Sequence, residues 1–237
     1  MPSLDLFDAP EGQDRKALLD HTLRRRILTM ELAPGAVLDE MALSEEFGLS
    51  RPPVRETMRQ LAGEGFIELE QNRAARVTSM SYQTLRDFFL AAPMIYTATT
   101  RLAALNRTSR EIEELKQIQA KFRESVSSGD VEARVFLNNR FHLFIGEMAH
   151  NVYLIPSLRR LLIDHARIGK TFYQEPHDQK QQGNLDTAVE QHDAIIAAIE
   201  KRDAPAAEDL IKAHWELSRR NMAMYATPEG LEVPLGS

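Results

Sequence analysis

The sequence contains no cysteine, which excludes disulfides, thiolate metal sites and cysteine nucleophiles. It also lacks an apolar run approaching the roughly 20 residues of a membrane span, and its N-terminus lacks the basic and apolar segments of a signal peptide. Acidic residues outnumber basic ones by 35 to 29, so the net charge of −6 gives no sign of nucleic-acid binding. These absences predict a cytoplasmic protein with no membrane partner, in which any DNA-binding function depends on local charge.

Glycine and proline are sparse, with 11 of each in 237 residues, and half of them lie between residues 34 and 65 or after residue 227. The periodicity of apolar residues before residue 80 predicts three helices and then a two-stranded hairpin, over 15–30, 40–47, 51–64, 66–70 and 75–78. After residue 80 the pattern is helical throughout, with helices expected over 82–105, 109–127, 131–149, 154–173, 186–201 and 204–225 and a polar loop over 175–186.

The second and third helices are joined through a tight turn at Gly48, which is the spacing of a helix–turn–helix. Two consecutive prolines, Pro52 and Pro53, fit a helix only in its first turn, so the third helix is expected to begin near Arg51. Ser50 occupies the N-cap position, but the prolines remove the backbone donors that a capping serine normally uses. The fixed φ angles of the prolines should therefore initiate this helix more than the serine does.

Five arginines give this region a local positive charge. Arg51, Arg55 and Arg59 recur every four residues and therefore share one face of the third helix. Arg73 and Arg76 are expected at the hairpin tip, beside that helix. A solvated surface helix would be the alternative interpretation, but the glycine turn, the tandem prolines and the basic hairpin in this order favour a helix that enters the major groove.

Residues 15–79 resemble the winged helix–turn–helix of the GntR family of bacterial regulators, through the segments 27–35 and 43–51 and through Pro53-Val54-Arg55-Glu56. The resemblance implies a recognition helix and a wing, and the predicted DNA-binding residues are Ser50, Arg51, Pro52, Arg55, Arg59, Arg73 and Arg76. Two positions depart from the family pattern. Met41 replaces an arginine that touches DNA in many members, and Ala74 replaces the usual wing-tip glycine.

Three of the seven histidines have a spacing that suggests a shared site. His192 lies eleven residues before Asp203, at the centre of the last predicted turn, and His214 lies eleven after it, so an antiparallel pair of helices would place both at one level. His142 lies mid-helix among apolar residues, and Asn138 is one helical turn earlier. This spacing is compatible with a metal site of imidazoles and one amide oxygen, and also with ordinary core histidines.

Residues 83–225 resemble the all-helical effector domain of the FadR branch of the GntR family, which often carries an aspartate and three histidines at these positions. The resemblance implies a divalent metal, zinc, nickel or manganese, held by His142, His192, His214 and, in place of the aspartate, Asn138. Ala92 and Tyr96 stand where members frequently carry an arginine and a glutamate. Other groups must then hold an effector, and the candidates are Tyr96, Arg101, Arg160, Arg167 and Tyr173.

These patterns together predict a mostly α fold, with a winged helix–turn–helix over 1–79, an all-α helical bundle effector domain over 80–226 and a flexible tail over 227–237. The predicted function is a repressor of a metabolic operon that binds a palindromic operator as a homodimer and is released by an organic acid. A metalloenzyme with Glu147 or Asp193 as general base would leave the arginine face unexplained, and a ligand-free scaffold is the third alternative.

Overall fold

The computed structural model describes residues 14–70, 73–173 and 179–226, and it divides the chain into two compact units, Met1–Ser81 and Tyr82–Ser237. The division falls two residues after the boundary expected from the sequence. The expected tail over 227–237 lies outside the described residues, as does the 174–178 part of the expected loop.

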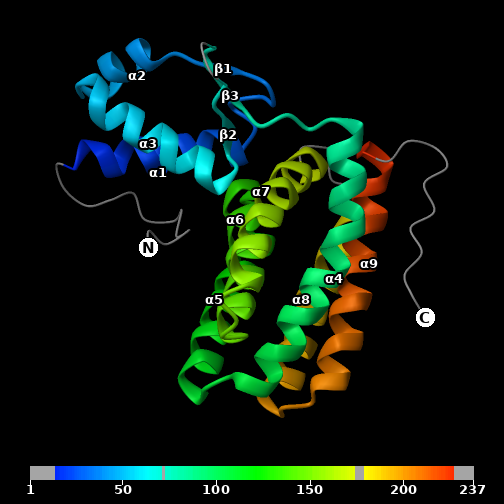
Figure 1. Cartoon of the computed structure of the whole chain (residues 1–237). Coiled ribbons are helices and arrows are strands. Elements are labelled where there is room, and N and C mark those ends of the chain that lie inside the picture. The colour runs from blue at the N-terminus through cyan, green and yellow to red at the C-terminus, as the bar shows by residue number, and fades with distance from the viewer. Residues whose placement is uncertain (1–13, 71–72, 174–178, 227–237) are drawn as a thin grey trace. The chain divides into compact units, whose positions relative to one another are not determined.

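The first unit contains the three expected helices, α1 (Arg15–Leu28), α2 (Glu40–Phe47) and α3 (Arg51–Glu64) (Figure 1). Helix α1 ends two residues earlier than predicted, because Met30 adopts a left-handed backbone with a φ of 60° and cannot continue the helix. The three helices share one apolar core, whose buried side chains include Leu19, Leu23, Ile27, Val54, Met58 and Leu61.

The expected hairpin forms from β2 (Ile67–Glu68) and β3 (Ala75–Val77), and a third strand that the sequence pattern did not predict adds to it. Strand β3 pairs antiparallel with both β2 and β1 (Val37–Leu38), in the order β1-β3-β2. The added strand is only two residues long, and it buries Leu38 on the same sheet as Ala75. Two residues are too few to show the alternation that is typical of a strand. Their pairing also depends on β3, which lies almost forty residues away in the sequence.

Six helices form the described part of the second unit: α4 (Tyr82–Asn106), α5 (Ser109–Ser128), α6 (Val131–Met148), α7 (Leu154–Tyr173), α8 (Gln179–Glu200) and α9 (Ala204–Ala226). They form an all-α bundle in which α4 packs against α6, α7, α8 and α9, and α5 packs against α6 and α8 (Figure 1). Helix α6 is buried along most of its length, because α4, α5 and α7 all pack against it.

Helix α8 begins at Gln179, whereas the sequence pattern placed its start at residue 186 within a polar loop. Residues 179–185, which were expected in the loop before the helix, are therefore helical. Within this stretch Leu185 is buried and packs with Phe122, Val126 and Leu137. A single apolar contact per turn is enough to hold a helix onto the bundle, but it is too little to produce a visible periodicity in the sequence.

Helix α4 is the one described helix long and apolar enough to span a membrane by length and composition, and 44% of its most apolar window is buried. The sequence was expected to contain no apolar run of this length, and α4 is the exception. One side of the helix belongs to the bundle core through Phe88, Phe89 and Tyr96. The other side exposes large apolar side chains, among them Leu90, Met94 and Leu105.

Candidate functional site

The turn at Gly48 and two prolines determine where α3 begins, and this end of the helix lies at the surface. Gly48 ends α2 with a φ of 60°, and a Cβ atom there would lie 2.7 Å from Arg15 Nη1. Arg15 Nη1 donates to the Gly48 carbonyl at 2.9 Å, and because this flexible arginine tip can move aside, it is the backbone angle that favours glycine. Helix α3 then begins with prolines in its first turn, and the side chain of Ser50 makes no capping hydrogen bond, as predicted.

Helix α3 separates a basic exposed face from an apolar buried face. Arg51, Arg55 and Arg59 are all exposed, whereas Val54 and Leu61 on the other side are completely buried. Pro52 is exposed beside the first arginine. The arrangement leaves the three guanidinium groups available to a ligand, and an exposed arginine fork is suited to bidentate contacts with guanine or phosphate.

One carboxylate of α2 links two of these arginines. Glu40 accepts from Arg51 Nε through Oε1 at 2.6 Å and from Arg55 Nε through Oε2 at 2.7 Å. The hydrogen bond from Arg55, together with that from Arg51, lowers the pKa of Glu40 below its ordinary value. The sequence analysis did not identify Glu40, although its place in the first turn of the preceding helix put it near the recognition face.

The arginine face borders a hollow of about 240 Å³ between α3 and the strands. Its lining residues are Leu38, Glu40, Arg55, Met58, Arg59, Leu69, Arg73, Ala74 and Ala75. Arginines from the helix and from the β2–β3 connection therefore face a common space. Met41, which replaces a family arginine, is 60% exposed on α2, so the substitution removes a charge from the surface without filling the core.

The two arginines of the hairpin occupy different positions. Arg73 lies at the end of the β2–β3 connection, is largely exposed and pairs with Glu70. Arg76 was expected at the hairpin tip, but it lies within β3, the central strand, and its Nη1 donates to the Gly35 carbonyl at 3.0 Å. The difference arises because β1 adds to the sheet next to β3, and the residues just before β1 supply that carbonyl. Residues 71–72 lie outside the described part of the chain.

In the helical unit, the three histidines singled out by their spacing come together in the core. His142 of α6, His192 of α8 and His214 of α9 are buried, and their ring nitrogens offer three ligand atoms within 4.8 Å of one another. The Nε2 atoms of His192 and His214 are 3.2 Å apart. The prediction that these two residues face each other across the last helical pair is therefore confirmed.

Neighbouring side chains fix the orientation of two of the rings. His192 Nδ1 is 2.9 Å from Gln119 Oε1, and His214 Nδ1 is 2.9 Å from Gln191 Oε1. Phe141 stacks on the ring of His192, with centroids 3.8 Å apart and planes at 13°. Both Nε2 atoms consequently point into the space shared with His142.

The chemistry of this donor set fits a divalent transition metal. Burial lowers the pKa of His142 and of His192 well below the ordinary value, and lowers that of His214 to about 4. All three rings are thus neutral at pH 7, which is the form that binds metal. His142 Nε2 is buried without a hydrogen-bond partner in the described structure. A buried nitrogen without a partner is unfavourable, and a cation in the shared space would satisfy it.

Asn138 lies one helical turn before His142 and is half-buried. Its position on α6 is the one expected for a fourth ligand, and its role remains a prediction. An amide oxygen there would bring no negative charge to the site, unlike the aspartate that the family often carries.

Sequence reasoning missed a fourth buried histidine beside the cluster. The ring of His165 on α7 lies 5.7 Å from that of His142, and its Nδ1 is 2.5 Å from the hydroxyl of Tyr96. Tyr96 also packs against His142 and against Trp215, whose indole Nε1 is buried without a hydrogen-bond partner in the described structure. Burial lowers the pKa of His165 to about 3. The apolar spacing of Leu158, Leu161 and Leu162 before it was the available signal.

The predicted effector residues do not gather at one place in the helical unit. Tyr96 alone among the described candidates reaches the histidine cluster. Arg101 is about half exposed and pairs with Glu208 at 3.2 Å, whereas Arg160 and the fully buried Arg167 both bind Asp164, at 3.0 and 3.1 Å. The side chain of Tyr173 lies outside the described part of the chain.

The carboxylates considered as general bases are both engaged by arginines. Glu147 binds Arg140 at 2.9 Å and Arg159 at 3.5 Å. Asp193 binds Arg123 and accepts from Gln119 Nε2 at 3.1 Å. Neither carboxylate is arranged to activate a water molecule at the histidines, so the geometry gives no support to a hydrolytic site.

Comparisons with known proteins agree with both units. Residues 18–77 match the family described as "Bacterial regulatory proteins, gntR family", and residues 94–217 match the "FCD domain". The chain is 27% identical over 196 residues to the "HTH-type transcriptional repressor RspR" of Escherichia coli, covering 82% of each protein. It is 26% identical over 189 residues to the "Uxu operon regulator" of Haemophilus influenzae, covering 75% of this chain and 68% of that protein.

Among solved structures, "E. coli McbR/YncC" superposes with a TM-score of 0.73 at 20% identity, covering 94% of this chain and 97% of that one. The family consists of DNA-binding transcriptional regulators and not of enzymes. The two family matches fall on the winged helix–turn–helix unit and on the helical bundle, and the structure adds the three histidines inside that bundle. The chain belongs to the GntR family of transcriptional regulators and carries an FCD domain.

Proposed function

We propose that this protein is a metabolite-responsive repressor that binds a short palindromic operator as a homodimer and is released by an organic acid bound beside a divalent metal. The observation that carries the DNA-binding part is the exposed face of Arg51, Arg55 and Arg59 on α3, next to the hollow that Arg73 also lines. Helices of this kind present their N-terminal residues to base edges in the major groove. The relatives named as a repressor and an operon regulator support the same regulatory role.

Dimerisation follows from the needs of recognition and from the surface of α4. One recognition helix reads a short half-site, so a second copy is needed for useful specificity. Leu90, Met94 and Leu105 leave an apolar stripe exposed along α4, with Met94 72% exposed. An exposed apolar stripe on a soluble regulator is typical of a surface that another protein covers. We therefore assign this stripe to the homodimer interface.

The metal would be held by His142, His192 and His214, with Asn138 as the fourth protein ligand. Imidazole ligands suit zinc and nickel, and the amide oxygen would also be acceptable to manganese, so the donor set does not distinguish them. The bound ion would act as a Lewis acid that attracts a carboxylate to its open coordination positions. Because all four protein ligands are neutral, the full charge of the ion remains available to an anionic effector.

The effector would be recognised by polar groups that already surround the cluster. The Tyr96 hydroxyl and His165 form a hydrogen-bonded pair, and the buried indole N–H of Trp215 has no acceptor in the described structure. A carboxylate or hydroxyl of a small acid could accept from that N–H. On this view the tyrosine replaces the family's charged residues in orienting the ligand, while the metal supplies the positive charge.

The DNA-binding part is tested by a fluorescence anisotropy titration against a palindrome selected from random DNA. Replacing Arg55 with alanine, or Arg51 with alanine, should weaken specific binding by about 1–3 kcal/mol, which is the value of one good base contact. Arg110→Ala is the matched control, because Arg110 is an exposed arginine on α5 of the other unit. Binding of both recognition-helix variants at wild-type strength would show that α3 does not read the operator.

The dimer is tested by light scattering at micromolar concentration. Met94→Glu places a charge in the proposed interface and should give the mass of one chain, whereas wild type gives the mass of two. Val152→Glu serves as the control, since Val152 is 75% exposed and belongs to the α6–α7 connection and not to the α4 stripe. A dimeric Met94→Glu variant would exclude this stripe as the interface.

A further inference from the structure

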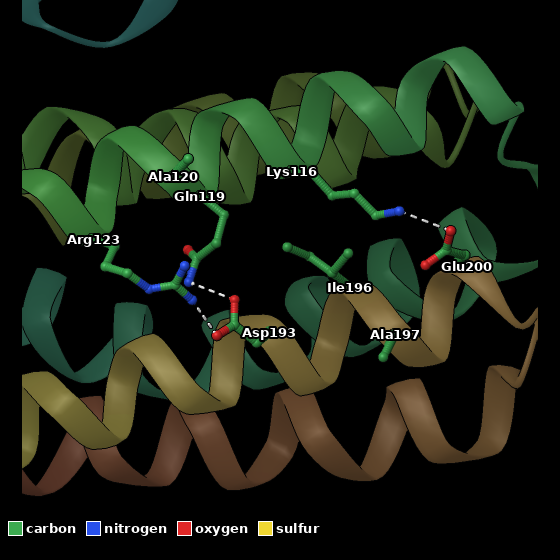
Figure 2. Close-up of a pocket in the computed structure, with 8 residues that line it drawn as sticks. All are labelled: Lys116, Gln119, Ala120, Arg123, Asp193, Ile196, Ala197 and Glu200. Atoms are coloured by element: carbon green, nitrogen blue, oxygen red, sulfur yellow. Dashed lines mark hydrogen bonds and ion pairs between the residues drawn. The ribbon is translucent and has the colours of Figure 1, made fainter.

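One buried amide connects the histidine cluster to the surface between α5 and α8. Gln119 is 2% exposed, and all of its polar atoms are used. Its Nε2 donates to the Val189 carbonyl at 3.0 Å and to Asp193 Oδ1 at 3.1 Å, while its Oε1 lies 2.9 Å from His192 Nδ1. Figure 2 shows Gln119 reaching from α5 toward Asp193 on α8.

These contacts determine which way the amide points. A backbone carbonyl and a carboxylate can only accept hydrogen bonds, so the NH₂ group of Gln119 must face Val189 and Asp193. The amide oxygen then faces His192, and an amide oxygen can only accept. Rotating the amide by half a turn would bring its oxygen against two acceptors and would lose both hydrogen bonds.

The orientation of the amide in turn determines the tautomer of His192. Because Gln119 Oε1 accepts, the proton of the neutral imidazole must be on Nδ1, and the lone pair must be on Nε2. That lone pair points toward His214 Nε2, 3.2 Å away. Metal-binding histidines are held in this way, by a partner that accepts from the ring nitrogen that does not bind the metal.

We propose that Gln119 is a positioning residue that holds His192 as the Nδ1–H tautomer, so that its Nε2 is permanently available as a metal ligand. The inference deepens the metal centre proposed above and rests on it. Nothing in the spacing of the histidines required this glutamine, and it takes the place that a carboxylate or a backbone carbonyl fills at many metal sites. Because Gln119 is neutral, it adds no charge. Neither the proposed metal ligands nor the partner of His192 is then a carboxylate.

An ion pair at the surface holds Asp193, which accepts a hydrogen bond from Gln119, in place. Asp193 binds Arg123 of α5 across the groove, and Lys116 pairs with Glu200 at 2.8 Å further along it (Figure 2). Gln119 lines the same hollow of about 290 Å³. Because Arg123 engages the second oxygen of Asp193, the first oxygen stays directed at the amide.

The proposal is tested first through the tautomer of His192, by ¹⁵N NMR of histidine-labelled full-length protein after chelator treatment. We expect His192, assigned by the loss of its signals in His192→Gln, to carry its proton on Nδ1. Gln119→Leu should give a mixture of the two tautomers. Gln117→Leu is the matched control, since Gln117 is exposed on the same helix, and it should leave the spectrum of His192 unchanged.

The second measurement is Zn²⁺ affinity, determined by competition with a chromophoric chelator. Gln119→Leu should weaken Zn²⁺ binding by about 10–100-fold, the usual loss when the partner of a metal-binding histidine is removed. The double variant Gln119→Glu with Asp193→Asn should restore the Nδ1–H tautomer of His192, although the Val189 carbonyl loses its donor. In it the carboxylate at 119 accepts from His192 and the amide at 193 donates to that carboxylate, with the total charge unchanged.

The outcomes separate the role of Gln119 from the existence of the metal centre. A proton on Nε2 of His192 in the wild-type protein would overturn the role of Gln119, whether or not Zn²⁺ binds. An unchanged tautomer and affinity in Gln119→Leu would overturn it as well. A wild-type protein that keeps the Nδ1–H tautomer but binds no added Zn²⁺ would instead contradict the proposed metal centre.

Discussion

Replacing His142 with leucine should change the stability of the helical domain in opposite directions with and without metal. His142 is 3% exposed, and its Nε2 has no hydrogen-bond partner in the described structure. Leaving a buried polar atom unsatisfied costs about 1–3 kcal/mol, and leucine removes that atom. A buried substitution of comparable size costs up to about 1.5 kcal/mol in imperfect packing. The metal-free variant should therefore gain about 1 kcal/mol over metal-free wild type.

With metal present the order should reverse. An ion at a thousandfold excess over its dissociation constant stabilises the wild-type fold by about 4 kcal/mol. For a domain of this size that corresponds to a rise in Tm of about 8–16 °C. The variant lacks one of three ligands that come from α6, α8 and α9, so this increment should nearly vanish.

The only tryptophan of the chain makes the measurement specific to this domain. Trp215 is 2% exposed in the bundle, so its fluorescence during urea unfolding reports the helical unit alone. His165→Leu is the contrasting variant. It removes the partner of the buried Tyr96 hydroxyl, so it should destabilise both forms while the metal increment persists. The reasoning is refuted if metal-free His142→Leu is less stable than wild type by 2 kcal/mol or more, or if it retains the metal increment.

Three further predictions concern charge. Asn138→Asp should tighten Zn²⁺ binding and weaken binding of an acidic effector, both measured by calorimetry, and stronger acid binding would contradict the charge argument. In the metal-free protein the folded pKa values of His165, about 3, and His214, about 4, lie below that of an unfolded histidine. Stability should therefore be complete above pH 6.5 and fall toward pH 4 by about 1.4 kcal/mol per pH unit for each group, and urea midpoints that rise on acidification would refute this. Arg24 is buried between two carboxylates of the first unit, and replacing it with alanine should lower the free energy of unfolding by about 1.5–3 kcal/mol. Thermal unfolding of the full chain measures this loss, and a Tm equal to wild type would show that these ion pairs are not stabilising.

The helix ends of this protein were largely predictable because they depend on local chemistry. Gly48 and Gly65 both adopt the left-handed backbone that ends a helix, and Thr108 forms a capping box with Glu111, a pattern of local sequence. The start of α8 at Gln179 was not predictable in this way, because it depends on packing against other helices.

The same distinction applies to the functional sites. Counting residues from the turn at Asp203 was enough to predict that His192 and His214 meet. In an antiparallel pair of helices, residues equally far from the turn lie at the same height along the helix axes. Gln119 could have been noticed as a polar residue on the apolar face of α5, four residues after Leu115. Its hydrogen bonds to α8 depend on how two helices meet in space, and no spacing within α5 encodes that.

The carboxylate of Glu40 has a consequence for how the regulator searches a genome. In the free protein it accepts hydrogen bonds from the Nε atoms of Arg51 and Arg55, so DNA that contacts these Nε atoms must displace it. This free-energy penalty is the same for every DNA sequence, so the ratio of the affinities for operator and for random DNA stays unchanged. Non-specific sites are vastly more numerous, however, and they retain fewer regulators when each encounter is weaker. More copies are then free in solution to find the few sites where base contacts outweigh the carboxylate.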